Sequence, residues 1–238
     1  MTGTVPALVL TLGAYAAAHA LWRRCGRHPL ANPTLLAIAA VVAALLLLRI
    51  PYAGYFADAQ PMHLLLGPAV VALAVPLHRH APLLRGRATA LAAALAAGSV
   101  AAAALGVGLA LVLGATGPAL ASLAPRSATT AVSMAISAQV GGIPALTAVL
   151  TIATGITGAV LGPAVLNALG VRDPVARRFA LGTASHGIAT ARAFQEGEAA
   201  GSAAGLAMGL NAVLTALLVP QLLRLLGAWL PGLGGGLP

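Results

Sequence analysis

The sequence predicts an all-α protein, a polytopic membrane bundle of about seven to eight membrane segments, some of them broken or re-entrant. Composition is the first reason: of 238 residues, 60% are apolar and only 7% are charged, whereas a soluble domain has about 25% charged residues. The second reason is a series of apolar runs close to the length of about 20 residues that crosses a bilayer as a helix. The third is that short basic loops flank these runs. We therefore expect one integral membrane domain over residues 1–238.

Five runs are expected to span the membrane as helices. The first is interpreted as a retained helix, because no basic region precedes it and no convincing cleavage site follows. The second is short, and its proline at position 33 suits the first turn of a helix. In order, the five runs are residues 5–22, 33–48, 88–113, 143–169 and 199–226.

Three further segments, residues 62–77, 115–139 and 179–195, are interrupted by Pro, Gly or polar residues. Each is predicted to be a full span, a half-helix or a re-entrant element, because broken backbone is tolerated in a membrane only where protein or water covers it. Each precedes a long apolar run, so the chain has three possible internal repeats. Transporters often contain repeats whose paired broken segments mark the binding site. Ordinary alternation of hairpins is the alternative.

Small residues recur at helix-packing spacing in two of the long runs. Such stripes let helix backbones approach closely. Packing inside one subunit is one interpretation, and a subunit interface, and hence a homo-oligomer, is the other. The stripes are Gly201, Gly205 and Gly209, and Thr151, Gly155, Gly158 and Gly162.

The net charge is +9, and nine of the thirteen arginines cluster in short loops at 23–32, 78–87 and 170–178. Basic loops favour the cytoplasmic side, which places these three loops inside and the N-terminus outside. Nucleic-acid binding would need basic and aromatic residues together on a soluble face, so we expect no nucleic-acid partner. The expected surroundings are the lipid bilayer of a bacterial cytoplasmic membrane.

The segment around position 126 is the first candidate site. If a helix begins at Ser127, then Thr129 and Ser133 share one face and Thr130 lies beside it. Hydroxyls at a helix N-terminus, next to the guanidinium of Arg126, suit a carboxylate. The alternative is that these hydroxyls bond their own backbone or hold helices together.

The second candidate site follows position 183. In a continuous helix Thr183, His186 and Thr190 share a face, with Ser185 beside them. Arg192 is suited to two-point binding of a carboxylate. We expect this stretch and the one at position 126 to meet at a hydrated pocket midway through the bilayer and to bind one substrate there.

Two residues of the second segment are candidates for ion coupling. His186 titrates near neutral pH, and Glu196, four residues after Arg192, is one of only four acidic residues. The alternatives are a histidine that only packs between helices and a glutamate in a solvated turn.

Enzymatic chemistry is not expected. The sequence lacks a G-x-S-x-G motif for a nucleophile and a Walker-type phosphate loop. Its histidines are scattered and it has one cysteine, so we expect neither a metal nor a cofactor.

The chain resembles the LrgB/CidB family of bacterial membrane proteins over residues of about 30–228. The motifs that carry the resemblance are NP at 32–33, LGPA at 66–69, AVPL at 74–77, PRSATT at 125–130, GGIPALTA at 141–148 and ALGTASHGIATAR at 180–192. Many members carry Lys where this chain has Arg126.

The resemblance implies two functions. Members are described as antiholin-like proteins that modulate murein hydrolase activity and autolysis beside a smaller LrgA/CidA partner. Related proteins, including a plastid glycolate/glycerate translocator, carry small monocarboxylates such as glycolate, glycerate and pyruvate. The carrier is the leading hypothesis and the regulator the alternative. A passive channel ranks last, because the polar groups form two short patches and no continuous face.

Overall fold

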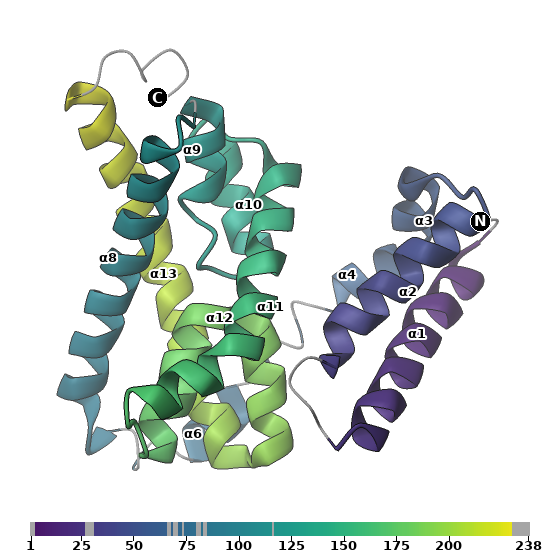
Figure 1. Cartoon of the computed structure of the whole chain (residues 1–238), viewed down its shortest axis with the longest axis horizontal. Coiled ribbons are helices and arrows are strands. Elements are labelled where there is room, and N and C mark those ends of the chain that lie inside the picture. The colour runs from purple at the N-terminus through teal and green to yellow at the C-terminus, as the bar shows by residue number, and fades with distance from the viewer. Residues whose placement is uncertain are drawn as a thin grey trace. The chain divides into compact units, whose positions relative to one another are not determined.

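The computed structural model describes residues 3–26, 31–65, 68, 71–72, 74–79, 82, 85–115 and 117–229. Its secondary structure is helical, with no strand among these residues, so the predicted all-α class is confirmed (Figure 1). The chain divides into two compact units, residues 1–75 and 76–238. Each is described by itself, and the expectation of one integral domain over the whole chain stays a prediction.

Unit 1 contains α1 (Thr4–Arg24), α2 (Pro33–Leu47), α3 (Tyr52–Asp58) and α4 (Gln60–Leu64). The Asn32-Pro33 pair starts α2 as the sequence suggests: the Asn32 side chain accepts hydrogen bonds from two backbone N–H groups of the first turn, and proline fits there because it lacks an N–H. The Thr11 and Tyr55 hydroxyls are 2.6 Å apart and join α1 to α3.

Among its described residues, unit 2 has one short helix at the unit boundary and six further helices. They are α6 (Ala74–Arg79), α8 (Ala88–Val112), α9 (Gly117–Leu123), α10 (Thr130–Gln139), α11 (Pro144–Ala168), α12 (Pro174–Glu196) and α13 (Glu198–Trp229).

All five predicted spans are helices. Four of them, α1, α8, α11 and α13, are long and apolar enough to cross a membrane, whereas α2 is apolar but only 15 residues long. The chain is therefore a multi-pass membrane protein. The interrupted segment 62–77 lies partly outside the described residues. The total of seven to eight segments and the repeats stay predictions.

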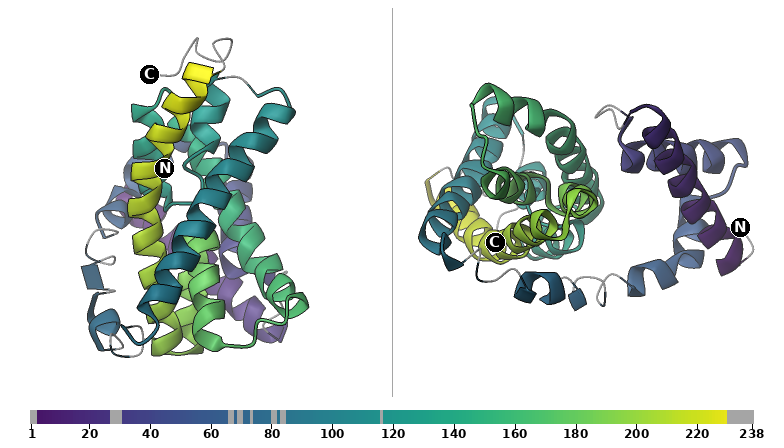
Figure 2. Two further views of the ribbon diagram at one scale, coloured as in Figure 1. Left: turned by 90° about the vertical axis from the view of Figure 1, so that its left-hand side faces the viewer. Right: turned by 90° about the horizontal axis from the view of Figure 1, so that it is seen from below.

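The two other interrupted segments enter unit 2 from opposite ends (Figures 1 and 2). Arg87, just before α8, pairs with Asp173, just before α12, and Arg79 pairs with Glu198 at the start of α13. These contacts define one end of unit 2, called here the basic end, from which α12 enters. The helices α9 and α10 instead follow the far end of α8. Arg87 from the predicted loop 78–87 thus lies beside Asp173 from the predicted loop 170–178, and the cytoplasmic placement of these loops stays a prediction.

The glycine stripes pack α12 between its two long neighbours. On α11, Gly155 and Gly158 lie directly against His186 and Ser185, in space that a side chain would fill. On α13, Gly201 lies against the Phe194 ring in the same way. The contacts at these positions support the interpretation as packing inside one subunit.

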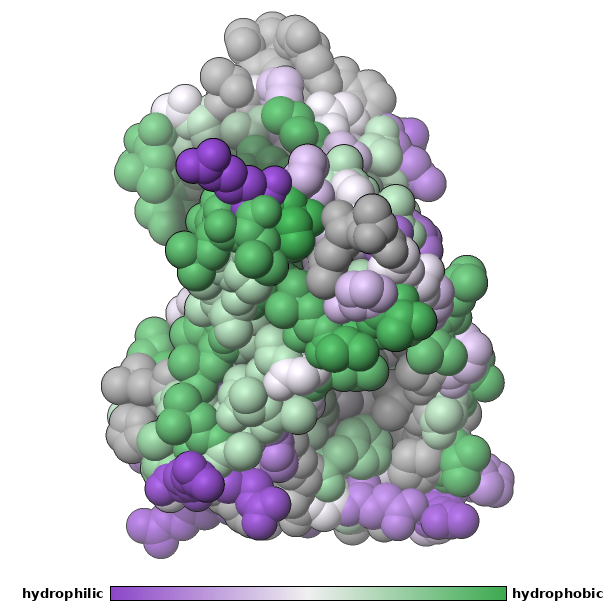
Figure 3. All heavy atoms as spheres, turned by 90° about the vertical axis from the view of Figure 1, so that its right-hand side faces the viewer, coloured by the Kyte–Doolittle hydropathy of each residue, from purple (hydrophilic) through white to green (hydrophobic). Residues whose placement is uncertain are grey.

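The outer faces of the long helices are apolar. Leu105 and Leu109 on α8 and Val149 on α11 are each more than 60% exposed. Figure 3 shows a different face, seen from the side opposite to α8 in Figure 1, and green apolar side chains cover much of it too. Such surfaces are stable when they face lipid.

Candidate functional site

The first break separates α9 from α10. Residues 124–129 form turns, with hydrogen bonds from Arg126 N to Leu123 O and from Ala128 N to Pro125 O. The Ser133 hydroxyl, from α10, donates to Pro125 O at 2.7 Å and folds the two limbs together.

The prediction of a helix from Ser127 is therefore wrong. The helix begins at Thr130, with Thr129 as the residue before its first turn. Proline lacks the N–H that a continuous helix needs, and the chain turns back at this point. Ser133 lies on α10 and is fully buried, whereas Thr129 precedes the helix and does not share its face.

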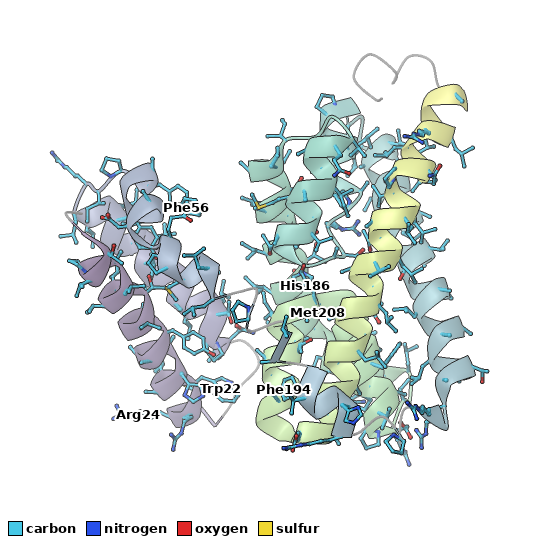
Figure 4. The ribbon with its side chains drawn as sticks, turned by 180° about the vertical axis from the view of Figure 1, so that it is seen from behind. Trp22, Arg24, Phe56, His186, Phe194 and Met208 are labelled. Atoms are coloured by element: carbon cyan, nitrogen blue, oxygen red, sulfur yellow. The ribbon has the colours of Figure 1, made fainter. Side chains whose placement is uncertain are left out.

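The second break lies at His186, inside α12. Its φ of 38° and ψ of −128° are not helical, and such a conformation costs a non-glycine residue about 1–3 kcal/mol. The predicted common face of Thr183, His186 and Thr190 is wrong, because the break puts Thr183 and Thr190 on different limbs. Figure 4 shows His186 inside the bundle, about midway along unit 2, with Phe194 nearer one end.

Side chains hold the broken backbone at His186. The imidazole Nε2 lies 3.0 Å from the Thr151 carbonyl oxygen of α11 and donates to it, so the proton is on Nε2. The Thr190 hydroxyl donates to the His186 carbonyl at 2.8 Å. The contact of the imidazole with α11 is possible because Gly155 leaves room for the ring.

Asn211, in the middle of α13, joins the two breaks. Its Nδ2 donates to the Ser127 carbonyl at 2.6 Å and to the Thr183 carbonyl at 3.2 Å. Its Oδ1 accepts from the Ser99 hydroxyl of α8 at 2.6 Å. The side chain is almost fully buried. One amide therefore ties α8, α13 and both interrupted segments together.

The physical need for these contacts is the same at both breaks. A helix that stops leaves carbonyl oxygens without N–H partners, and lipid offers none. Asn211 donates to the carbonyls of Ser127 and Thr183, and hydroxyls donate to those of Pro125 and His186, of which Pro125 also accepts from the Ala128 N–H. Among the predicted Ser and Thr sites, Ser133 and Thr190 thus bond backbone at the breaks, which is the structural alternative considered for such hydroxyls, and substrate binding by these sites stays a prediction.

Two hydroxyls near the second break have no partner. Within the described residues, the buried Ser185 Oγ and Thr151 Oγ1 make no hydrogen bond. The Ser185 hydroxyl lies over Gly158 of α11. Ser185 is completely buried in the unit.

The two arginines expected to meet have different neighbours. The guanidinium of Arg126 lies over Gly106 of α8 and donates to the Ala102 carbonyl at 3.3 Å. The charge of Arg192 interacts with that of Arg178, on the other limb of α12. The structure brings the two breaks together through Asn211, and the meeting of the two guanidinium groups at one pocket stays a prediction.

The remaining predicted site residues are Ser127, Thr129, Thr130 and Glu196. Ser127 is buried, with its hydroxyl 3.4 Å from that of Thr215. Thr129 and Thr130 are half-buried. The side chain of Glu196 lies outside the described residues.

The sequence analysis missed Asn211 and its partner Ser99. A signal was present, because each is a polar residue well inside a run predicted to span the membrane, where polar groups are costly. Both residues lie in spans that were identified by their overall hydropathy, and this average changes little when one residue in the span is polar.

Asp173 is an acidic residue at the basic end, where it lies among arginines. Its side chain accepts from the Ala176 N–H in the first turn of α12, and it also pairs with Arg87. The backbone hydrogen bond first, and the arginine second, hold the pKa of this exposed carboxyl below its usual range. Among the described residues no group of His, Cys, Asp or Glu side chains is arranged to hold a metal ion.

The fold and this site define a class of protein: a multi-pass helical membrane protein with two broken elements joined at a buried amide. Comparison with known families gives the assignment. The profile of the LrgB-like family matches residues 11–225. This chain belongs to the LrgB-like family, as its motifs suggested, and the match begins earlier than those motifs did.

Similar proteins cover most of the chain. It is 35% identical over 193 residues to the uncharacterized protein YxaC of Bacillus subtilis, covering 81% of this chain and 84% of that one. It is 31% identical over 198 residues to the holin-like protein CidB of Staphylococcus epidermidis, covering 83% and 86%. It is 28% identical to the holin-like protein CidB of Staphylococcus aureus, with the same coverage. No solved structure matches.

Proposed function

We propose that this protein is a holin-like membrane regulator of murein hydrolase activity and autolysis, acting with a small LrgA/CidA-type membrane partner. The observation that supports this function is the similarity to holin-like proteins CidB over 83% of the chain. The comparisons favour it over the carrier described below.

Autolysis of a bacterium that lacks its own LrgB-like gene tests the regulator. The chain is expressed with and without a CidA-type partner, and detergent-induced lysis and murein hydrolase activity on zymograms are measured. We expect lysis to change when both proteins are present, and the partner to purify with the chain. Unchanged lysis together with no co-purification would contradict this function.

The geometry favours a second function, a carrier for small monocarboxylates of the glycolate, glycerate and pyruvate class. The supporting observation is that two broken elements from opposite ends meet at Asn211. Broken helices that meet near the middle of a bundle form the binding sites of many transporters. In this proposal the Asn211 bonds hold the closed state, and access to one side requires that one break separates from it.

Arg126 is the proposed carboxylate ligand. The Arg126 side chain is partly exposed beside the first break. In the sequence, Arg126 comes shortly before Thr129 and Thr130, where α10 starts. A positive charge next to a helix N-terminus favours an anion. His186 is the proposed proton-coupling group, because its ring carries one proton on Nε2 and sits at the second break.

Uptake into proteoliposomes tests the carrier and separates it from the regulator. We expect saturable uptake of glycolate, glycerate or pyruvate, loss of uptake in Arg126→Ala, and partial uptake in Arg126→Lys, which keeps the charge but not the planar geometry. Equal uptake in all three proteins would contradict the role of Arg126. No uptake by the natural protein, with lysis still altered in cells, would leave only the regulator.

The proposed location is a bacterial cytoplasmic membrane, with the basic end of unit 2 facing the cytoplasm. The arginines at that end follow the bias of cytoplasmic loops. A homo-oligomer is compatible with this arrangement. The role proposed in either case is not enzymatic.

A further inference from the structure

The helices α8 and α13 cross in unit 2 (Figure 2, left). A groove runs along the two helices on one side of this crossing. Its volume is about 670 Å³, within the range of about 300–1,000 Å³ that holds a small ligand. Its walls include Leu91 and Leu95 of α8, Phe179 of α12, and Leu210 and Leu214 of α13. Arg85, which precedes α8, is the one charged residue among the described residues that line it.

We propose that this groove binds one acyl chain of an anionic phospholipid, with the lipid phosphate at Arg85. An apolar channel with a single cation at its end matches the two chemistries of such a lipid. Basic pockets between membrane helices are known to bind anionic headgroups. The proposal is independent of both functions proposed above.

The length of the groove fits one leaflet. Along α8 the lining residues run from Ala88 to Ala96, and along α13 from Leu206 to Leu214. Eight residues of helix rise about 12 Å, close to half of the hydrocarbon thickness of about 30 Å. The groove starts at the basic end, where arginines would meet headgroups, and stops near the middle of the bundle.

The charge at Arg85 is available to a ligand. The side chain is exposed, and Arg85 takes part in neither of the two ion pairs found among the described residues. The neighbouring Arg87 differs, because Asp173 offsets its charge. A second groove of about 610 Å³, between α8 and α12, has Arg87 at its end. It therefore suits an anionic lipid less well than the groove at Arg85.

Native mass spectrometry of the full-length protein in detergent tests the site, with phosphatidylglycerol or phosphatidylcholine added. We expect phosphatidylglycerol to be retained more strongly than phosphatidylcholine. Removing one surface cation should weaken binding of the anionic lipid about fivefold in Arg85→Ala, and Arg85→Lys should restore it. Equal retention of the two lipids by the natural protein would overturn the proposal.

Neighbouring alanines supply a matched pair that leaves the charge unchanged. Ala92 and Ala96 are exposed on α8 and line the groove, whereas Ala93 is exposed and lines neither groove. Ala92→Phe should fill the groove and lower retention of phosphatidylglycerol, and Ala93→Phe should not. Equal effects of the two changes, or no bound lipid in the natural protein because residues 1–75 or a second copy cover the groove, would overturn it. Monodisperse elution confirms folding of each variant.

Discussion

Replacing Asn211 by Ala should destabilise unit 2 more than any other single polar truncation on α13. The change removes three hydrogen bonds, from Ser99 and to the carbonyls of Ser127 and Thr183. Side-chain hydrogen bonds between membrane helices contribute about 0.6 kcal/mol each, which gives about 2 kcal/mol. Leaving two buried carbonyls unpaired costs about 1–3 kcal/mol each in addition, so the expected loss is about 4–8 kcal/mol.

Unfolding by SDS in mixed micelles measures this loss. Gln221→Ala is the matched control, because it removes an exposed amide from the same helix and should change stability by less than about 0.5 kcal/mol. Asn211→Asp keeps an acceptor for Ser99 but loses both donors when ionised, and it should be at least as destabilising as Asn211→Ala at neutral pH. Similar unfolding midpoints for the Asn211 and Gln221 variants would refute the argument that this amide joins the two breaks.

Three further predictions concern α12. His186→Gly should be about 1 kcal/mol more stable than His186→Ala, because both lose the imidazole and only glycine accepts a φ of 38° freely; the reverse order in SDS unfolding would argue against strain at this residue. Gly182→Ala should cost about 1–3 kcal/mol, because its new methyl would press on the Ala204 backbone. Gly187→Ala meets no atom within 4 Å and serves as its control. The lowered pKa of Asp173 stabilises the folded state above pH 3.8, and this stabilisation is lost as the pH falls through the lower folded pKa. Asp173→Asn should therefore be less stable than the natural protein at pH 7, and the difference in stability should disappear in acid. A difference in stability that is independent of pH would contradict the linkage.

The two proposed functions make different demands on the same residues. A carrier needs Arg126 and an Asn211 contact that can open, since solute must pass the two breaks. A regulator needs an intact fold and a surface for its partner. Variants that fold normally but lose uptake, while lysis in cells is unchanged, would assign the polar centre to transport alone.

The sequence by itself determined the membrane class, the helical class and where the long helices lie. Hydropathy is a property of local windows of chain, and the apolar runs at 88–113, 143–169 and 199–226 coincide with α8, α11 and α13 to within a few residues. The segments that contain the two breaks were also readable, because polar residues beside Pro125 and Gly187 are costly in lipid unless the backbone there departs from a lipid-facing helix. The break at His186 itself was not readable, since helical spacing was expected to continue through it.

Only the tertiary structure decided what meets at those breaks. Asn211 is 84 residues from Ser127 and 112 from Ser99, and no local pattern links positions so far apart. Helical spacing placed Thr183 and Thr190 on one face, but a single non-helical residue at His186 separated them. The pairing of orphaned carbonyls with a distant amide depends on how the chain is routed through the bundle, and this routing is set by packing of whole helices against one another.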